Sequence, residues 1–419
     1  MGYKTLFIIL DGVGDHIIKT FHGKTPLEAA KKPNIDKLCR FAECGVVSPV
    51  DIGVVPGSDT GHLGLFGYDP YRYYPGRGVF EALGLNIKLE EGDIAFRVNF
   101  GTVDNNFLII DRRAQRNPEG IDSIIKEFNS KVGEIESKYG VKIILKHGVE
   151  HRGVLVIKGK NLSNKISDID VHKVGIKAKE VSPLNDTKSA RITAEIVNKI
   201  ISLFYDVSKN HVANDRRKEK GLLPVNYLLL RGVSMYKPLK DQDTFYSRYQ
   251  LKPVFIAGAP MYLGVAKYVG MDTIKPAGAT GTVNTSLVSK AESAISARQK
   301  YDIIFVHIKA TDTLSHDKNP KGKKKFIELI DQRFFSRIKD EFDIIVLTSD
   351  HTTSSILGEH TADPVPIMIY SVEDIIHRKD SVKNFAERKC YKGILGHLKG
   401  IHIIRLILNK IGKGIKYGT

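Results

Sequence analysis

Residues 5–15, TLFIILDGVGD, set the pattern that decides the fold: a short apolar run that stops at an acidic residue, Asp11. The chain repeats this pattern in DIIFVHIKATD at 302–312 and in DIIVLTSDH at 343–351. Short runs without polar alternation are typical of central strands in a parallel sheet that helices cover on both faces. Ligands bind at the carboxyl ends of such strands, so acidic residues at three of these ends predict one shared site.

Other segments extend this pattern. A further strand is predicted at 365–370, and helices are predicted at 34–44, with Gly45 as the C-cap, at 326–342 and at 393–411. The middle of the chain is richer in charge, with weaker strands at 95–100, 107–110, 141–145, 153–157 and 225–230 and a helix at 189–204. The fold class is therefore α/β, a parallel-sheet domain with an inserted smaller α+β domain.

Composition indicates a cytoplasmic protein. The 419 residues contain no apolar run long enough for a membrane helix, and the N-terminus lacks a basic region and a cleavage site, so neither a membrane partner nor a signal peptide is expected. Three cysteines without a CxxC motif fit a reducing compartment better than a disulfide scaffold.

The net charge of +17 raises a nucleic-acid-binding alternative. The basic residues are spread along the chain, and neither a zinc-finger pattern nor an RNA-binding aromatic signature accompanies them. We therefore expect an anionic small-molecule partner and no nucleic acid. Nothing in the sequence sets the oligomeric state.

Polar residues suited to metals gather after the apolar runs. Asp312 and His316 are four residues apart, so that on a helical turn they share one face. Asp350 and His351 are adjacent, and His360 precedes the strand at 365–370. A tight turn is the ordinary reading of Asp11 with its two glycines, and an N-cap is that of Ser58, which begins a probable helix after Pro-Gly.

Together these residues predict two metal sites. One would consist of Asp312, His316 and His360, and the other of Asp11, Ser58, Asp350 and His351. Nitrogen and oxygen ligands without cysteine suit Mn²⁺ or Zn²⁺, and carboxylate-rich sites also accept Mg²⁺. Two metal ions about 4 Å apart are a recurrent arrangement for phosphoryl transfer.

The same motifs carry a family resemblance, together with others between them. The matching segments are FIILDGVGD, PGSDTGHLGLFGYDP, GRGVFEALGL, FRVNFGTVD, DRRAQR, EHRGVL, LLLRG, IAGAPMYLGVAKYVGM, HIKATDTLSHD, LTSDHTT and EHTADPVP. On these segments the chain resembles the archaeal type of cofactor-independent phosphoglycerate mutase, in the alkaline phosphatase superfamily. The metal motifs are shared across that superfamily, whereas the intervening ones point to the mutase.

The resemblance implies an alkaline-phosphatase-like domain, residues 1–88 and 236–419, and an inserted substrate-binding, transferase-like domain, residues 89–235. Ser58 would carry phosphate, Lys309 and His62 would contact the phosphoryl group, and the two sites above would hold divalent ions. Mn²⁺ is the expected ion, with Mg²⁺, Zn²⁺ or Co²⁺ as alternatives, and 2,3-bisphosphoglycerate is not required. The residues expected to bind substrate in the inserted domain are Arg112, Arg113, Arg116, His151, Arg152 and Arg231, with Asp111 as an acid/base candidate.

The function implied is the interconversion of 3-phosphoglycerate and 2-phosphoglycerate through phosphoserine, in glycolysis and gluconeogenesis. A homoserine-kinase-like phosphotransferase or a phosphatase of the same superfamily is the alternative, because the same metal motifs would serve all three. These alternatives differ in the acceptor of the phosphate, which is the glycerate itself, a second molecule or water.

Overall fold

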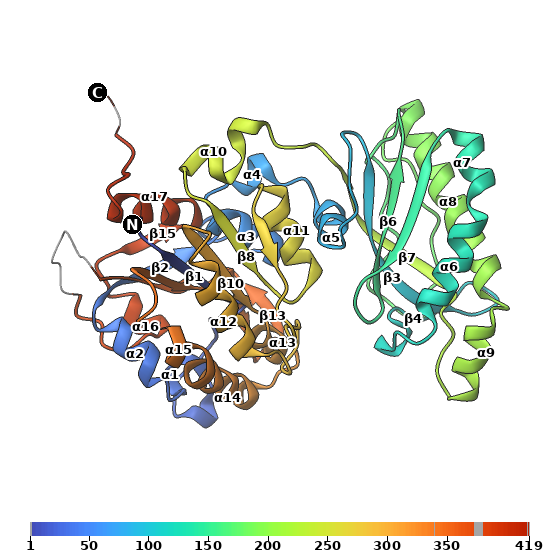
Figure 1. The fold of residues 1–419 in the computed structure, drawn as a ribbon. Helices are drawn as coiled ribbons and strands as arrows, with labels where there is room; N and C mark the ends of the chain where they lie inside the picture. Colours follow the sequence, from blue (N-terminus) through green and yellow to red (C-terminus); the bar gives the residue numbers. More distant parts are fainter. Residues whose placement is uncertain (1, 339, 373–379, 417, 419) are drawn as a thin grey trace. The chain divides into compact units, whose positions relative to one another are not determined.

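The computed structural model describes residues 2–338, 340–372, 380–416 and 418. The chain divides into two units, Met1–Tyr74 with Lys240–Thr419 (unit 1) and Pro75–Leu239 (unit 2) (Figure 1). Unit 2 begins before the expected residue 89 because helix α5 (Arg77–Gly84) packs on the sheet of unit 2, against strands β3 (Ile94–Val103) and β7 (Tyr227–Met235). The expected class, an α/β domain with an inserted α+β domain, is confirmed.

Unit 2 is an antiparallel sheet with helices. Its strands follow the order β4-β3-β6-β5. Strand β7 also pairs with β3, on the side away from β6. Its further elements are β4 (Ile109–Asp111), α6 (Ile121–Lys131), α7 (Gly133–Tyr139), β5 (Lys142–His147), β6 (Arg152–Lys158), α8 (Lys188–Ser208) and α9 (Val212–Glu219). Strand β3 is buried along its whole length, since it is the central strand and both its faces are covered.

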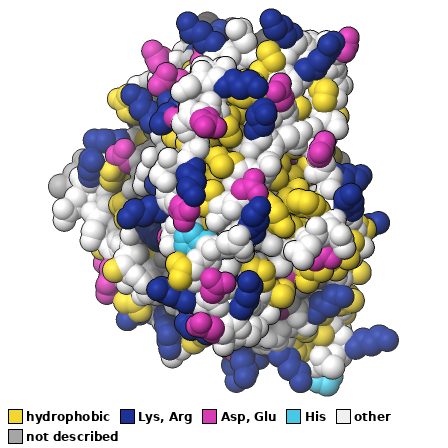
Figure 2. Space-filling model, turned by 90° about the vertical axis from the view of Figure 1, so that its right-hand side faces the viewer, with side chains coloured by type: hydrophobic (Ala, Val, Ile, Leu, Met, Phe, Trp, Pro, Cys, Tyr) yellow, Lys and Arg dark blue, Asp and Glu magenta, His cyan; other side chains and the backbone are white. Residues whose placement is uncertain are grey.

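Basic side chains are distributed over the face drawn in Figure 2. Lys and Arg lie there among Asp, Glu and hydrophobic side chains and do not form one continuous strip. That face gives the nucleic-acid alternative no support. None of the helices in the described part of the chain has the length and apolar character needed to cross a bilayer.

Unit 1 is built on a sheet with the order β15-β2-β14-β11-β1-β10-β8-β9. The strands are β1 (Thr5–Leu10), β2 (Ala42–Ser48), β8 (Pro253–Ile256), β9 (Asp272–Ile274), β10 (Ile303–Ile308), β11 (Ile344–Thr348), β14 (Val365–Ser371) and β15 (Gly396–Lys399). Its helices are α1 (Pro26–Ala29), α2 (Pro33–Cys39), α3 (Ser58–Leu65), α4 (Pro70–Tyr73), α10 (Phe245–Tyr249), α11 (Pro260–Tyr268), α12 (Leu287–Ala297), α13 (Ala310–His316), α14 (Pro320–Ile330), α15 (Ser336–Ile338), α16 (Glu387–Cys390) and α17 (Ile403–Lys410).

The sheet is mixed, because β14 runs antiparallel to both of its neighbours, β11 and β2. No crossover helix lies between β11 and β14. They are joined by a segment that contains the short hairpin β12 (Thr352–Ser354) and β13 (Glu359–Thr361). The chain therefore enters β14 beside the carboxyl end of β11 and runs back antiparallel to it. This hairpin carries residues of the site described below.

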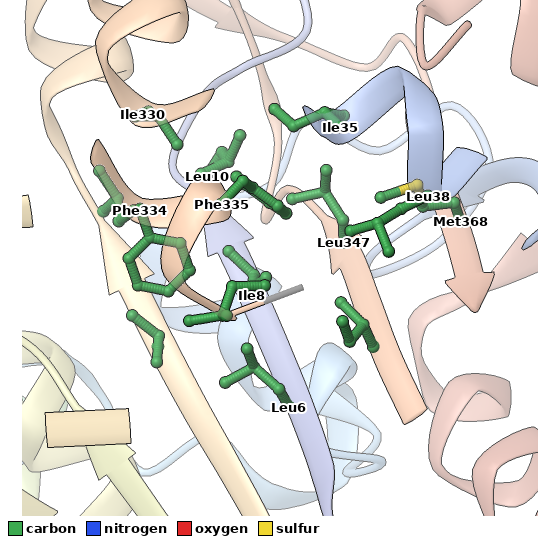
Figure 3. Close-up of a cluster of buried hydrophobic side chains, with 14 of the residues drawn as sticks. Leu6, Ile8, Leu10, Ile35, Leu38, Ile330, Phe334, Phe335, Leu347 and Met368 are labelled. Carbon is green, nitrogen blue, oxygen red and sulfur yellow. The ribbon is translucent and has the colours of Figure 1, made fainter. Parts of the chain in front are cut away.

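Both faces of the central strand β1 are buried. Leu6, Ile8 and Leu10 face α2, α14 and the π-helical turn Asp331–Phe335, where Phe334 and Phe335 pack (Figure 3). On the other face, Phe7 lies 5.1 Å from Phe305, centroid to centroid. This two-sided burial explains why the run lacks polar alternation.

Two predicted helices are wrong in part. The helix expected at 34–44 ends at Cys39, and Ala42–Ser48 forms strand β2 instead. The helix expected at 393–411 is helical only at 403–410, because Gly396–Lys399 is strand β15, paired with β2. A Cβ at Gly45 would lie 2.6 Å from the Gly396 oxygen, so Gly45 allows close pairing rather than capping a helix.

Candidate active site

The three strands that the sequence marked are neighbours in the sheet. Strand β1 pairs in parallel with β11 on one side and β10 on the other, with Ile9 opposite Thr348 and Leu10 opposite Ile308. Their carboxyl ends therefore meet at one edge, and the Asp11 amide donates to the Ile308 oxygen. This register brings together side chains from positions hundreds of residues apart.

The first predicted ligand set is brought together. Asp312 and His316 lie on α13 and His360 lies on β13. The Asp312 Oδ1 atom is 3.2 Å from His316 Nε2 and 3.5 Å from His360 Nε2. One ligand atom of each of the three residues lies within 4.8 Å of the others, which is a spacing that one metal ion can bridge.

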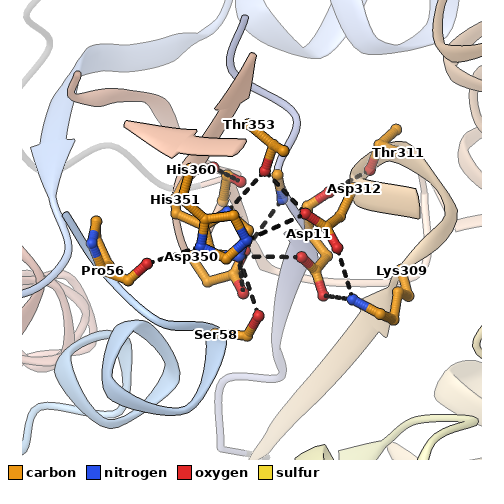
Figure 4. Close-up of polar contacts among 12 residues, drawn as sticks. Asp11, Pro56, Ser58, Lys309, Thr311, Asp312, Asp350, His351, Thr353 and His360 are labelled. Carbon is orange, nitrogen blue, oxygen red and sulfur yellow. Dashed lines mark hydrogen bonds and ion pairs between the residues drawn. The ribbon is translucent and has the colours of Figure 1, made fainter. Parts of the chain in front are cut away.

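The second predicted set surrounds His351 (Figure 4). Its Nε2 atom is 3.1 Å from Ser58 Oγ, 3.3 Å from Asp11 Oδ1 and 3.3 Å from Asp350 Oδ2. Ligand atoms of Asp11, Asp312 and His351 also lie within 4.8 Å of one another, so the two sets adjoin. All of these residues are buried, and Ser58 begins helix α3.

Hydrogen bonds fix the orientation of all three histidines. Nδ1 of His316 donates to the Gly358 oxygen, and Nδ1 of His360 donates to the Pro56 oxygen, 2.9 Å away. Nδ1 of His351 donates to the Thr353 hydroxyl, which in turn donates to Asp312 Oδ1. Each ring therefore keeps Nε2 for the site, which is the arrangement found in histidines that bind metals.

The site also has acceptors left over for a cation. Asp11 Oδ1 and Asp350 Oδ2 are buried and make no hydrogen bond within the described part of the chain. Although burial opposes protonation, Asp350 and Asp11 raise the pKa of His351 to about 10. Without a metal ion, a proton on His351 thus offsets the two carboxylates. A divalent ion fits this donor set.

Lys309 lies at the same edge. Its Nζ is 2.8 Å from Asp312 Oδ2 and 3.3 Å from Asp11 Oδ2. Burial acts against the charge, but the carboxylates of Asp11 and Asp312 hold the pKa of Lys309 well above its usual value. Lys309 is thus a fixed cation beside both ligand sets.

The position of His62 differs from the expected phosphate contact. Its ring is fully buried among Phe66, Phe255, Tyr262 and other aromatic rings, and its Nδ1 donates to the Ser58 main-chain oxygen at 2.6 Å. Because the His62 side chain is fully buried, we infer that it supports the main chain at Ser58 rather than contacting phosphate.

Sequence reasoning missed Tyr262, His307 and Thr353. Tyr262 Oη and His307 Nε2 both donate to Asp11 Oδ2, at 2.5 and 2.8 Å. Tyr262 lies inside a helix, where nothing in the local pattern marks it, whereas His307 lies inside an apolar strand. A histidine within an otherwise apolar run was the available signal.

Unit 2 gathers the predicted substrate residues into one cationic cluster. Burial first, and then Arg152, Arg113, Arg97 and Arg116, lower the pKa of His151 to about 3. Burial also lowers the pKa of Arg231, with Arg77, Arg112 and Arg152 adding to the effect. The arginine cluster therefore consists of Arg77, Arg97, Arg112, Arg113, Arg116, His151, Arg152 and Arg231.

Asp170 organises part of this cluster. Its Oδ1 accepts from Arg112 Nε at 2.7 Å, and its Oδ2 accepts from Asn99 at 2.8 Å. Asp111, the acid/base candidate, instead accepts from the amides of Arg113 and Gln115 and so closes a turn.

Arg97 was not predicted as a site residue. It lies on the buried central strand β3, and its Nε makes no hydrogen bond within the described residues. Burial and the neighbouring Arg77 hold the pKa of Arg97 well below its usual value. An arginine in a strand of mainly apolar residues was the signal for it.

Comparisons with known proteins agree on one family. A family model described as 2,3-bisphosphoglycerate-independent phosphoglycerate mutase matches residues 40–214. Proteins of that name from Sulfolobus acidocaldarius and Methanocaldococcus jannaschii are 42% and 41% identical to this chain, covering 100% and 99% of it and 99% of each relative. A solved cofactor-independent phosphoglycerate mutase from Thermoplasma acidophilum matches with a TM-score of 0.67 and 30% identity, over 98% of this chain and 100% of that one. A solved protein from Pyrococcus horikoshii matches with a TM-score of 0.83 and 33% identity, over 100% of both chains.

Proposed function

Because this chain belongs to the 2,3-bisphosphoglycerate-independent phosphoglycerate mutases, we propose that it moves phosphate between the two hydroxyls of glycerate through a phosphoserine at Ser58. The enzyme is an isomerase that acts on a small phosphorylated molecule. The proposal concerns the route: which residue carries the phosphate, what stabilises its charge and what holds the glycerate.

Ser58 is the proposed nucleophile. Its Oγ lies 3.1 Å from His351 Nε2, at the first residue of helix α3, where the helix dipole favours a negatively charged group. The Ser58 Oγ forms a bond to phosphorus while the bond between phosphorus and the glycerate oxygen breaks, so the phosphoryl group moves to Ser58. Ser58 gives up its hydroxyl proton, and the glycerate oxygen takes up a proton and becomes a free hydroxyl. The hydrogen bond from His62 Nδ1 to the main-chain oxygen of Ser58 keeps this turn of the backbone in place.

Charge on the transferring group is balanced by cations at the strand ends. Asp312, His316 and His360 would hold one divalent ion, and Asp11, Ser58, Asp350 and His351 the other, with Mn²⁺ as the proposed ion. Such ions, when bound, make a serine hydroxyl easier to deprotonate and stabilise the attacking and leaving oxygens. Lys309 adds a fixed positive charge, which stabilises the phosphoryl oxygens without reorganisation.

The arginine cluster of unit 2 is the proposed site for the glycerate carboxylate. Planar guanidinium groups bind carboxylates in a bidentate manner, and the cluster has an excess of positive charge. Arg97 belongs in this set, because its guanidinium is buried beside other arginines and its Nε makes no hydrogen bond within the described residues, only an ion pair with Glu81 at 3.9 Å.

The observation that carries the proposal is the convergence of Ser58, His351, Asp11 and Asp350 at the carboxyl ends of β1 and β11. Substrate-treated protein should carry phosphate on Ser58, detected by mass spectrometry after rapid acid quenching. Ser58→Ala should lose turnover of 3-phosphoglycerate in a coupled assay without bisphosphoglycerate. Chelation should also abolish turnover, and Mn²⁺ should restore it.

Ser354→Ala is the matched control. This serine is also buried near the site, but its hydroxyl contacts His16 at 3.1 Å rather than the ligand sets. It should keep most of the activity and show no change in phosphate labelling. Near-normal turnover of Ser58→Ala would rule out the phosphoserine route.

A further inference from the structure

The carboxylate of Asp11 is bonded unequally. Its Oδ2 atom accepts from Tyr262 Oη at 2.5 Å, from His307 Nε2 at 2.8 Å and from Lys309 Nζ at 3.3 Å. Its Oδ1 atom makes no hydrogen bond within the described residues and lies 3.3 Å from His351 Nε2. Oδ2 therefore has three donors, whereas Oδ1 is left available to bind a cation in the site.

Tyr262 and His307 form a rigid support for this arrangement. Their rings stack with centroids 3.8 Å apart, and both side chains are almost fully buried. The amine of Lys290, also buried, donates to the His307 main-chain oxygen at 2.7 Å. Neither ring can move without disrupting packing, so the two donors stay aimed at Oδ2.

Rotation about the Cβ–Cγ bond would otherwise exchange the two oxygens of Asp11. Lys309 alone cannot prevent this, because its amine is shared with Asp312, which lies closer to it than Asp11 does. The stacked pair comes from two different elements, helix α11 and strand β10, and both of its donors meet at a single oxygen. That convergence defines the orientation of the carboxylate plane.

We propose that Tyr262 and His307 are positioning residues that commit Asp11 Oδ1 to the divalent ion of the Ser58 site. This inference rests on the proposed metal chemistry and assigns it two residues outside the predicted ligand sets. They act through Asp11 and touch neither the ion nor the substrate. Loss of such a supporting donor weakens metal binding by about 10- to 100-fold.

Tyr262→Phe tests the proposal, because it removes one hydroxyl and keeps the ring stack. Mn²⁺ affinity of the full-length chain, without substrate, should be measured by titration calorimetry and by electron paramagnetic resonance of free Mn²⁺. We expect one of two binding steps to weaken by roughly 10-fold or more. The other step, which belongs to Asp312, His316 and His360, should be unchanged and should disappear in His316→Ala.

Tyr249→Phe is the matched control. Tyr249 is also buried, and its hydroxyl donates to the Gly67 oxygen at 2.9 Å, outside the ligand sets. Thermal unfolding of this variant measures how much stability is lost when a buried hydroxyl is removed. The variant should leave the affinities of both Mn²⁺-binding steps unchanged. His307→Phe, which keeps a ring without the donor, should weaken the same step as Tyr262→Phe.

Two results would overturn the inference, and they are distinguishable. If wild-type protein binds Mn²⁺ in two steps and Tyr262→Phe and His307→Phe match it in both, the positioning role fails while the metal proposal stands. If wild-type protein binds no Mn²⁺, the metal proposal fails and takes the positioning role with it.

Discussion

Single residues at this site are defined by which of their atoms remain unused. Each of the three site histidines uses Nδ1 in a bond to oxygen, and Asp11 uses Oδ2, so the remaining atoms face one another. The sequence could supply the ligand types, because motifs after apolar runs are local. It could not supply the supporting donors, because Tyr262 and His307 reach Asp11 only through the fold.

His151 leads to a prediction about pH. Its folded pKa of about 3 lies below the ordinary value of 6.5, because burial and neighbouring arginines disfavour the charged ring. The unfolded chain therefore binds a proton first as the pH falls, and stability present above pH 6.5 is lost progressively toward pH 3. Between pH about 7 and about 5, His151→Gln should lose less unfolding free energy than wild type.

Denaturant unfolding of the two proteins at both pH values is the measurement. The comparison uses the change with pH in each protein, so a constant cost of the substitution cancels. The other buried histidines contribute equally to both. Identical pH dependence in the two proteins would contradict a neutral, buried His151.

Elements were predictable where the pattern is local and not where pairing is remote. The three strands that precede Asp11, Asp312 and Asp350 are buried on both faces, and their mainly apolar runs predict this burial. The error at 34–44 arose because β2 depends on β14 and β15, which come more than 300 residues later. Helical spacing in 34–44 was a correct signal only up to Cys39.

Helix α3 illustrates how an element places a residue. A Cβ at Gly61 would lie 2.3 Å from the main-chain oxygen of Asp350, so glycine allows the helix to approach the end of β11. Gly61→Ala should push α3 outward, with a cost in stability of about 1–3 kcal/mol. Because Ser58 begins the same helix, turnover should fall by about 100-fold.

Gly133→Ala provides the comparison for Gly61→Ala. This glycine begins helix α7 and has open space around it, so alanine there should leave stability equal or slightly higher. Unfolding curves and the coupled assay measure both effects. A Gly61→Ala enzyme with wild-type turnover would show that the close approach of α3 does not position Ser58.

At the scale of the whole molecule, the proposed function divides the chemistry between the two units. The residues proposed to handle the phosphoryl group belong to unit 1, and the arginine cluster belongs to unit 2, which the chain enters after Tyr74 and leaves before Lys240. A phosphatase would need only the first set. The second set offers a way to retain the glycerate after its phosphate has moved to Ser58, which a mutase without bisphosphoglycerate requires.

Retention predicts intramolecular transfer. If the arginine cluster keeps the glycerate carboxylate while Ser58 holds the phosphate, the return step is effectively unimolecular, an advantage of up to roughly 7–11 kcal/mol in favourable geometries. With 3-phosphoglycerate labelled in both carbon and phosphate and mixed with unlabelled substrate, early 2-phosphoglycerate should carry the two labels together. Arg97→Met should weaken retention, so that labels scramble or free phosphate appears, while Ser58 is still phosphorylated. Scrambling or phosphate release by the wild-type enzyme at a rate comparable to turnover would instead favour a phosphotransferase or phosphatase route, because the acceptor would then be a second molecule or water.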